Sequence, residues 1–81
     1  MGIREYIDVL NLNKKMSFQE IADFVGVEKY VVHKWKKGGC EPKPKNFEKV
    51  QEMVEILGKF EINYRKQAID ILNRERANGK V

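Results

Sequence analysis

Apolar residues recur at helical spacing along almost the whole chain, and no segment shows the sustained two-residue alternation of a half-buried strand. The spacing predicts five helices. The first covers about residues 3–12 and places Ile3, Ile7 and Leu10 on one face. The hydrophobic pattern therefore predicts an all-α fold.

The second and third helices have the clearest boundary signals. Ser17 followed by Glu20 forms a capping box at the start of the second helix, and Gly26 is suited to end it. The third helix is expected at about 28–37, with Val32 and Trp35 facing inward. Gly38 and Gly39 should stop this helix, because glycine favours helix ends.

The last two helices carry more apolar rows than one small domain needs. Asn46, after a loop containing Pro42 and Pro44, is predicted to cap the fourth helix, and the fifth should run from about 63 to 77 and stop at 78–79. The expected core stripe of the fourth helix consists of Phe47, Val50, Val54 and Leu57. The surplus rows favour a subunit interface, with simple exposure in a small protein as the alternative; they include Met53, Ile56, Phe60, Tyr64 and Ile71.

Composition limits the chain to one small globular domain. It has 81 residues, of which 42% are hydrophobic and 35% charged, and a core of this size is thin. The chain has a single cysteine and no signal-peptide pattern, which favours a cytoplasmic protein. It also has no apolar run of about 18 residues, so we expect no membrane role.

The excess positive charge is concentrated in one stretch. Residues 28–45 contain six lysines and two glutamates, so this segment accounts for the whole net charge of +4. Aromatic and histidine side chains are interleaved with the lysines. The combination suits a phosphate backbone, although a merely solvated helix face is the alternative.

Other chemistry has weak support in the sequence. His33 and Cys40 supply two of the four ligands that a structural zinc site needs, and no third group is placed to orient them for catalysis. Trp35 is expected to be a core anchor, since it lies three residues after Val32. We therefore expect no enzyme activity, metal, cofactor or small-molecule substrate.

Ile21, Ala22, Val25, Gly26, Val27, Val32 and Trp35 together meet the steric requirements of two short helices that cross closely. Ala22 is small enough for the contact, Gly26 tolerates positive φ in the turn, and Val32 and Trp35 anchor the second helix. The pattern resembles the DNA-binding helix-turn-helix.

Over residues 16–58 the chain resembles the Cro and phage-repressor family. The residues that carry this resemblance are Val32, Trp35, Lys37, Gly38, Pro42, Pro44, Phe47, Val50, Leu57 and Gly58. It implies a compact five-helix, lambda-repressor-like domain that binds palindromic operator DNA as a homodimer and represses transcription. Residues 1–58 would form the DNA-binding core, and 59–81 a C-terminal helix that completes the same domain and is a candidate dimerisation element.

Carried over by position, the resemblance implies that DNA is faced by Glu28, Lys29, Tyr30, His33, Lys34 and Lys37. Gln19 is displaced by one from the family's usual glutamine, where Phe18 stands, and Glu28 replaces the frequent Ser or Thr cap. The Glu28 carboxylate could accept from a cytosine amino group or favour the positive end of the helix dipole.

The positions of these residues in the chain predict which of them contact bases and which contact phosphates. Base edges would be read by Lys29, Tyr30, His33 and Lys34, and phosphates would be bound by Lys36, Lys37, Lys43, Lys45 and the backbone amides near Asn46. Two alternatives to a transcriptional regulator remain open: a DNA-binding module for recombination or DNA handling (excisionase-like, transposase-like or a phage packaging subunit), and a helix-turn-helix scaffold for protein contacts.

Overall fold

A computed structural model describes residues 2–78, and this part of the chain folds into five α-helices without strands. The helices are α1 (Ile3–Asp8), α2 (Phe18–Val25), α3 (Lys29–Lys37), α4 (Pro44–Leu57) and α5 (Gln67–Asn78). A short π-helical turn, η1 (Val9–Asn13), continues α1. The predicted all-α class is confirmed.

Local signals explain the boundaries of α2 and α3. The Ser17 hydroxyl accepts from the Glu20 N–H at 3.1 Å, and the Glu20 carboxylate accepts from the Ser17 N–H at 2.8 Å, so the predicted capping box is present. Gly26 (φ +90°) and Gly38 (φ +82°) end the two helices in the left-handed conformation. An L side chain is strained there, which explains glycine at both positions.

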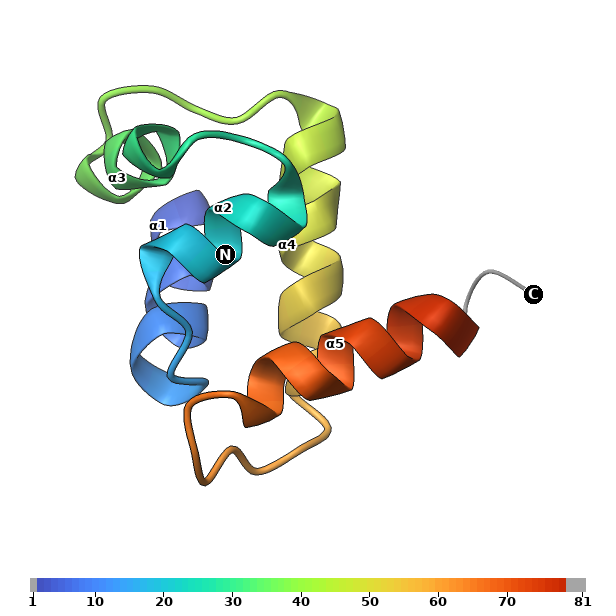
Figure 1. Cartoon of the computed structure of the whole chain (residues 1–81). Helices are drawn as coiled ribbons and strands as arrows, with labels where there is room; N and C mark the ends of the chain where they lie inside the picture. The colour runs from blue at the N-terminus through green and yellow to red at the C-terminus, as the bar shows by residue number, and fades with distance from the viewer. Residues whose placement is uncertain (1, 79–81) are drawn as a thin grey trace.

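Side chains of all five helices contribute to the core, and α5 packs across the C-terminal part of α4 (Figure 1). Trp35 is only 1% exposed and lies among the buried side chains of the other helices, so its predicted role as a core anchor is confirmed. The remaining buried side chains include Ile3, Ile7, Leu10, Met16, Ile21, Ala22, Val25, Val32, Val50 and Leu57.

The predicted start of α4 is too late by three residues. Lys43 takes the N-cap position and Pro44 is the first helical residue, so Asn46 lies inside the first turn and does not cap the helix. Proline fixes a φ suited to this position and has no N–H to leave unsatisfied.

The predicted start of α5 is also too early. Gln67 N–H donates to Tyr64 O at 3.1 Å, a bond across three residues, and the four-residue helical spacing begins only with Asp70 N–H to Lys66 O at 3.0 Å. Residues 63–66 therefore belong to the connection between α4 and α5. The last described residue of α5 is Asn78, which agrees with the predicted stop at 78–79. Gly79 lies outside the described residues.

Several apolar rows that looked surplus in the sequence are part of the core. Met53 and Ile71 are buried and Ile56 is half-buried, whereas Phe47 and Val54, which were expected in the core stripe, are only half-buried. The reading of Met53 and Ile71 as free for a partner is therefore wrong, because α4 and α5 cover them by packing together. Phe60 and Tyr64 remain exposed.

None of the helices described for residues 2–78 has the length and the apolar character needed to cross a membrane.

Candidate nucleic-acid interface

Helices α2 and α3 pack against each other across a three-residue turn, 26–28. The Ala22 carbonyl accepts from Gly26 N–H at 2.8 Å and from Val27 N–H at 3.0 Å, which closes the end of α2. Ala22 is fully buried, as expected for a small residue at a close helix crossing. Because Val32 and Trp35 are also buried, α3 is held on the core by one face only.

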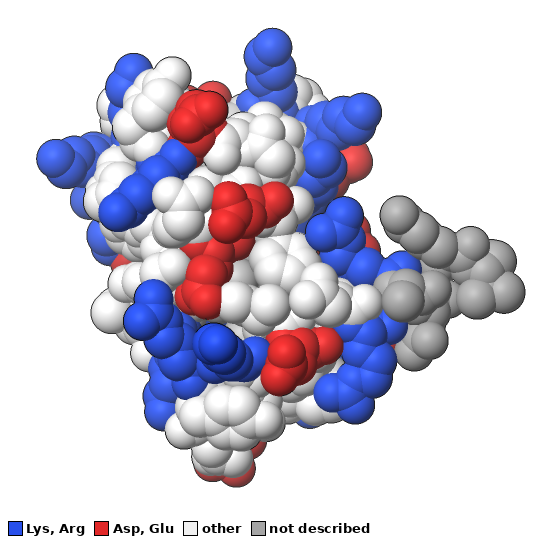
Figure 2. All heavy atoms as spheres, in the orientation of Figure 1, with Lys and Arg blue, Asp and Glu red and all other residues white. Residues whose placement is uncertain are grey.

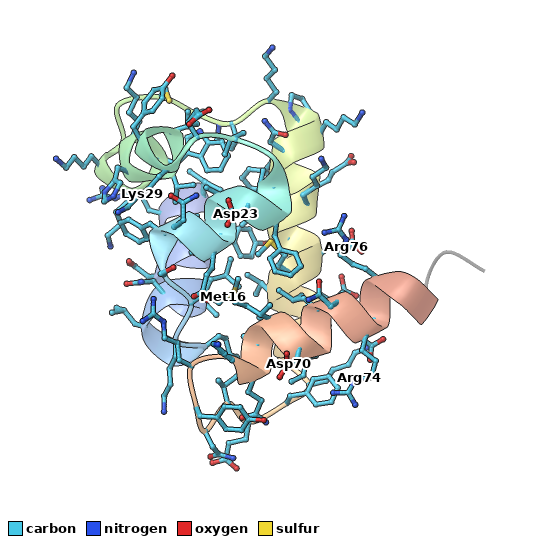
Figure 3. The ribbon with its side chains drawn as sticks, viewed as in Figure 1. Met16, Asp23, Lys29, Asp70, Arg74 and Arg76 are labelled. Carbon is cyan, nitrogen blue, oxygen red and sulfur yellow. The ribbon has the colours of Figure 1, made fainter. Side chains whose placement is uncertain are left out.

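The opposite face of α3 presents Tyr30, Lys34 and Lys37, which follow one another at helical spacing and are all exposed. Tyr30 is 59% exposed. The Lys34 ammonium lies 5.2 Å from the centre of the Tyr30 ring, within the range of a cation–π contact. Lys29 is exposed beside this row, and Figure 3 shows it at the outer edge of the molecule. We call Lys29, Tyr30, Lys34 and Lys37 the exposed face of α3.

His33 and Glu28 lie next to this face in different environments. His33 is half-buried, and its ring meets the Phe18 ring edge-on with the two centres 4.4 Å apart. Part of its surface is therefore used to hold α3 against the start of α2. Glu28 takes the N-cap position of α3 and is exposed, but its side chain makes no capping hydrogen bond.

Lys36 does not share the exposed face of α3. It is half-buried and forms an ion pair with Asp8 of α1, which ties α3 to α1. The phosphate contact of Lys36 stays a prediction, but its ammonium, unlike those of Lys34 and Lys37, already has an acidic partner in the described residues. Sequence gave no signal of this pair, since the two residues are 28 positions apart.

Gln19 is exposed on α2, and its amide donates to the Asp23 carboxylate at 2.9 Å. Asp23 lies on the face of α2 that is turned toward the viewer in Figure 3. A carboxylate at this place repels an approaching phosphate, so Gln19 is less favourably placed for DNA than the lysines.

Lys43, Lys45 and Asn46 gather at the start of α4. The connection after α3 brings this start to the same end of the molecule as α3 (Figure 1). Lys43 and Lys45 are exposed, and Asn46 is half-buried. The amides of Lys45 and Asn46 belong to the first helical turn, where N–H groups have no partner within the helix and can meet an anion.

The end of the molecule formed by α3 and the start of α4 is more basic than the middle of the molecule. Among residues 2–78, the ion pairs are Lys36 with Asp8 and Arg65 with Glu20, so five lysines near α3 and the start of α4 have no acidic group within ion-pair distance. These five are Lys29, Lys34, Lys37, Lys43 and Lys45. Figure 2 shows basic side chains projecting at this end, with acidic side chains across the middle of the same view.

Within the described residues, no group of three or more His, Cys, Asp and Glu side chains is placed to hold a metal ion. Cys40 is exposed in the connection between α3 and α4. The arrangement thus offers a row of unpaired cations with an aromatic ring among them, which suits the binding of a polyanion.

No protein-family model matches the chain, and comparison with curated proteins and with solved structures gives no significant match.

Proposed function

We propose that this protein is a sequence-specific DNA-binding regulator of transcription, most simply a repressor of the Cro and phage-repressor type. In this proposal α2 and α3 form a helix-turn-helix, and α3 enters the major groove. The observation that carries it is the exposed face of α3, which presents three lysines and Tyr30 on a helix anchored by Trp35.

The contacts then divide by position. Lys29, Tyr30 and Lys34 read base edges, because a lysine can donate to guanine O6 and N7 and an aromatic ring can contact a thymine methyl group. Lys43, Lys45 and the amides at the start of α4 bind phosphates and fix the register of α3 on the duplex.

A homodimer is part of the proposal. Two copies of α3 would lie in successive major grooves about 34 Å apart and would read a palindromic site. Of the apolar side chains in α4 and α5 that looked surplus, the half-buried Ile56 remains available for such a contact, whereas Phe60 and Tyr64 are exposed in the connection between the two helices.

The small remaining apolar surface favours a second candidate, a DNA-binding module that acts as a monomer in recombination or DNA handling. With Met53 and Ile71 buried inside the domain, less area is left for a symmetric partner than the sequence pattern indicated. Such a module would read one asymmetric site.

The test is selection of bound sites from random duplex DNA at physiological salt, where nonspecific binding is only about 10⁻⁴ to 10⁻⁶ M. A recovered palindrome supports the dimeric regulator, and a single asymmetric site supports the monomeric module. Absence of any enriched sequence refutes sequence-specific binding.

A matched pair of variants makes the selection sharper. Lys34→Gln, on the exposed face of α3, should relax the preference at one or two base pairs, at about 1–3 kcal/mol for each lost contact. Lys59→Gln removes the same charge from the connection between α4 and α5 and should leave the selected sequence unchanged. Equal effects of the two variants would contradict the assignment of α3 to base reading.

A further inference from the structure

Two segments far apart in the sequence are joined at the end of the molecule opposite α3. The Lys14 ammonium donates to Phe60 O at 3.0 Å, and the Lys15 ammonium donates to Asn63 O at 3.4 Å. These bonds attach the end of η1 to the connection between α4 and α5. Figure 1 shows this connection on the far side of the domain from α3. We call residues 12–15 and 59–66 the distal surface.

The distal surface has a strong positive charge that a segment-by-segment count of the sequence does not show. It contains five basic residues and one acidic residue, Glu61, so its net charge is +4, equal to that of residues 28–45. The basic residues are Lys14, Lys15, Lys59, Arg65 and Lys66. The rest of the chain then carries −4.

The positive charge of the distal surface is available to a partner. Arg65 is the one member paired with an acid in the described residues, and its Nε lies 3.9 Å from the Glu20 carboxylate, at the limit of an ion pair. Lys14 and Lys15 donate to neutral carbonyls, which position the ammonium groups but do not cancel their charge.

Apolar side chains are exposed among these cations. Four large hydrophobic side chains are exposed in the described part of the chain, and three of them belong to the distal surface: Leu12 (70%), Phe60 (37%) and Tyr64 (60%). Exposed apolar side chains on two joined segments, rimmed by charged residues, are typical of a protein interaction site. Aromatic residues and arginine are also the types that dominate binding energy at such sites.

We propose that the distal surface binds a segment of another protein in which acidic residues accompany leucine or phenylalanine side chains. The cations select the acidic residues, and Leu12, Phe60 and Tyr64 supply the apolar contact. This proposal does not depend on the proposed function, and because α3 lies at the opposite end, both surfaces can be occupied at once.

Two other occupants fit the observations less well. A nucleic acid would use the cations and could stack on Tyr64, but Leu12, the most exposed apolar side chain, has no ring for stacking and gains nothing from a phosphate. A symmetric contact between two copies would bring two surfaces of charge +4 together, which is repulsive.

The test is a titration of the isotopically labelled full chain, followed by NMR amide shifts. The probe is a synthetic 14-residue peptide of aspartate and glutamate with leucine or phenylalanine at every third or fourth position. We expect shifts concentrated in residues 12–15 and 59–66 and an affinity that falls as salt is raised. A peptide of the same apolar pattern with lysine in place of the acids should not bind.

Variants at exposed positions keep the test independent of folding. Lys66→Gln should weaken peptide binding by about 2- to 5-fold, the range of one exposed ion pair, and Lys66→Arg should retain it. Tyr64→Ser should weaken binding through the lost apolar contact, and Lys43→Gln, at the other end of the molecule, should have no effect. Far-UV circular dichroism checks that each variant is folded.

Four results would overturn the proposal. The first is no shifts on the distal surface, and the second is equal binding of the lysine peptide. The third is stronger shifts on this surface with a 20-nucleotide single strand or a duplex than with the acidic peptide. The fourth is concentration-dependent shifts of the distal surface in the protein alone. The third would assign the surface to nucleic acid, and the fourth to a second copy of the chain. Because duplex binding is followed at α3 in the same spectra, failure here is distinguishable from failure of the DNA-binding function.

Discussion

Replacing Lys43 and Lys45 together by glutamine should sharply reduce the salt dependence of DNA binding. Five lysines near α3 and the start of α4 have no acidic partner among the described residues, and these two belong to that group. Each cation that neutralises a phosphate contributes about 0.9 to the slope of log affinity against log salt. Because Lys29 and Lys34 are assigned to base edges, Lys37, Lys43 and Lys45 remain for phosphates, and the slope should be about −2.7 for one protein chain and about −0.9 for the double variant.

These slopes predict a large difference in a simple assay. Between 50 and 200 mM salt, the native chain should lose affinity by about 40-fold and the double variant by about 3- to 4-fold. Fluorescence anisotropy of a labelled duplex, repeated at four or five salt concentrations, measures both slopes. The comparison should hold for any duplex sequence, because phosphate contacts carry no sequence information.

Three single variants with the same change in net charge test whether position matters. Lys43→Gln should lower the magnitude of the slope by about 0.9. Lys36→Gln should leave it unchanged, because Lys36 is paired with Asp8, and Lys59→Gln should leave it unchanged because it belongs to the distal surface. If all three lower the slope equally, the lysines act through net charge alone and the reasoning from their positions is refuted.

Three further predictions concern stability, measured by urea or thermal unfolding. Trp35→Ala should lower the free energy of unfolding by about 3–5 kcal/mol, since the side chain is buried, and a loss below about 1 kcal/mol would contradict its role as a core anchor. Gly26→Ala should lower the free energy of unfolding by about 1–2 kcal/mol, because Gly26 has φ +90°. Gly39→Ala should lower it less, because the added Cβ meets nothing closer than 3.7 Å, and equal losses would contradict the strain argument. Lys15→Asn should stabilise the domain by up to about 1 kcal/mol, because Lys15 has φ +61° and asparagine tolerates this conformation better; a lower melting temperature would show that the bond from Lys15 to Asn63 matters more.

Much of the candidate DNA interface could be predicted from the sequence because it depends on local signals. The capping box at Ser17, the glycines at 26 and 38, and the spacing of Val32 and Trp35 fix which face of α3 is outward. Lys29, Tyr30, Lys34 and Lys37 are exposed as expected. Their binding to DNA stays a prediction.

The surroundings of other candidate site residues depend on side-chain contacts that the sequence analysis did not include. Lys36 looks like its neighbours in the sequence, but Asp8 of α1 pairs with it. His33 is partly covered by Phe18 of α2. Gln19 is engaged by Asp23 four residues later on the same helix, a pair that helical spacing could have indicated. An interaction between side chains on different helices leaves no mark in local periodicity, so only the packing shows which polar groups already have partners.

The sequence by itself determined the all-α class, the limits of α2 and α3, and the basic character of the segment after Glu28, because capping, glycine conformations and charge are properties of short stretches of chain. Tertiary structure decided which apolar rows are buried, since Met53 and Ile71 have neighbours only when α4 and α5 pack together. It also created the distal surface, whose joining bonds span 46 and 48 residues. Charges so far apart in the chain form one surface only because folding brings them to the same end of the molecule.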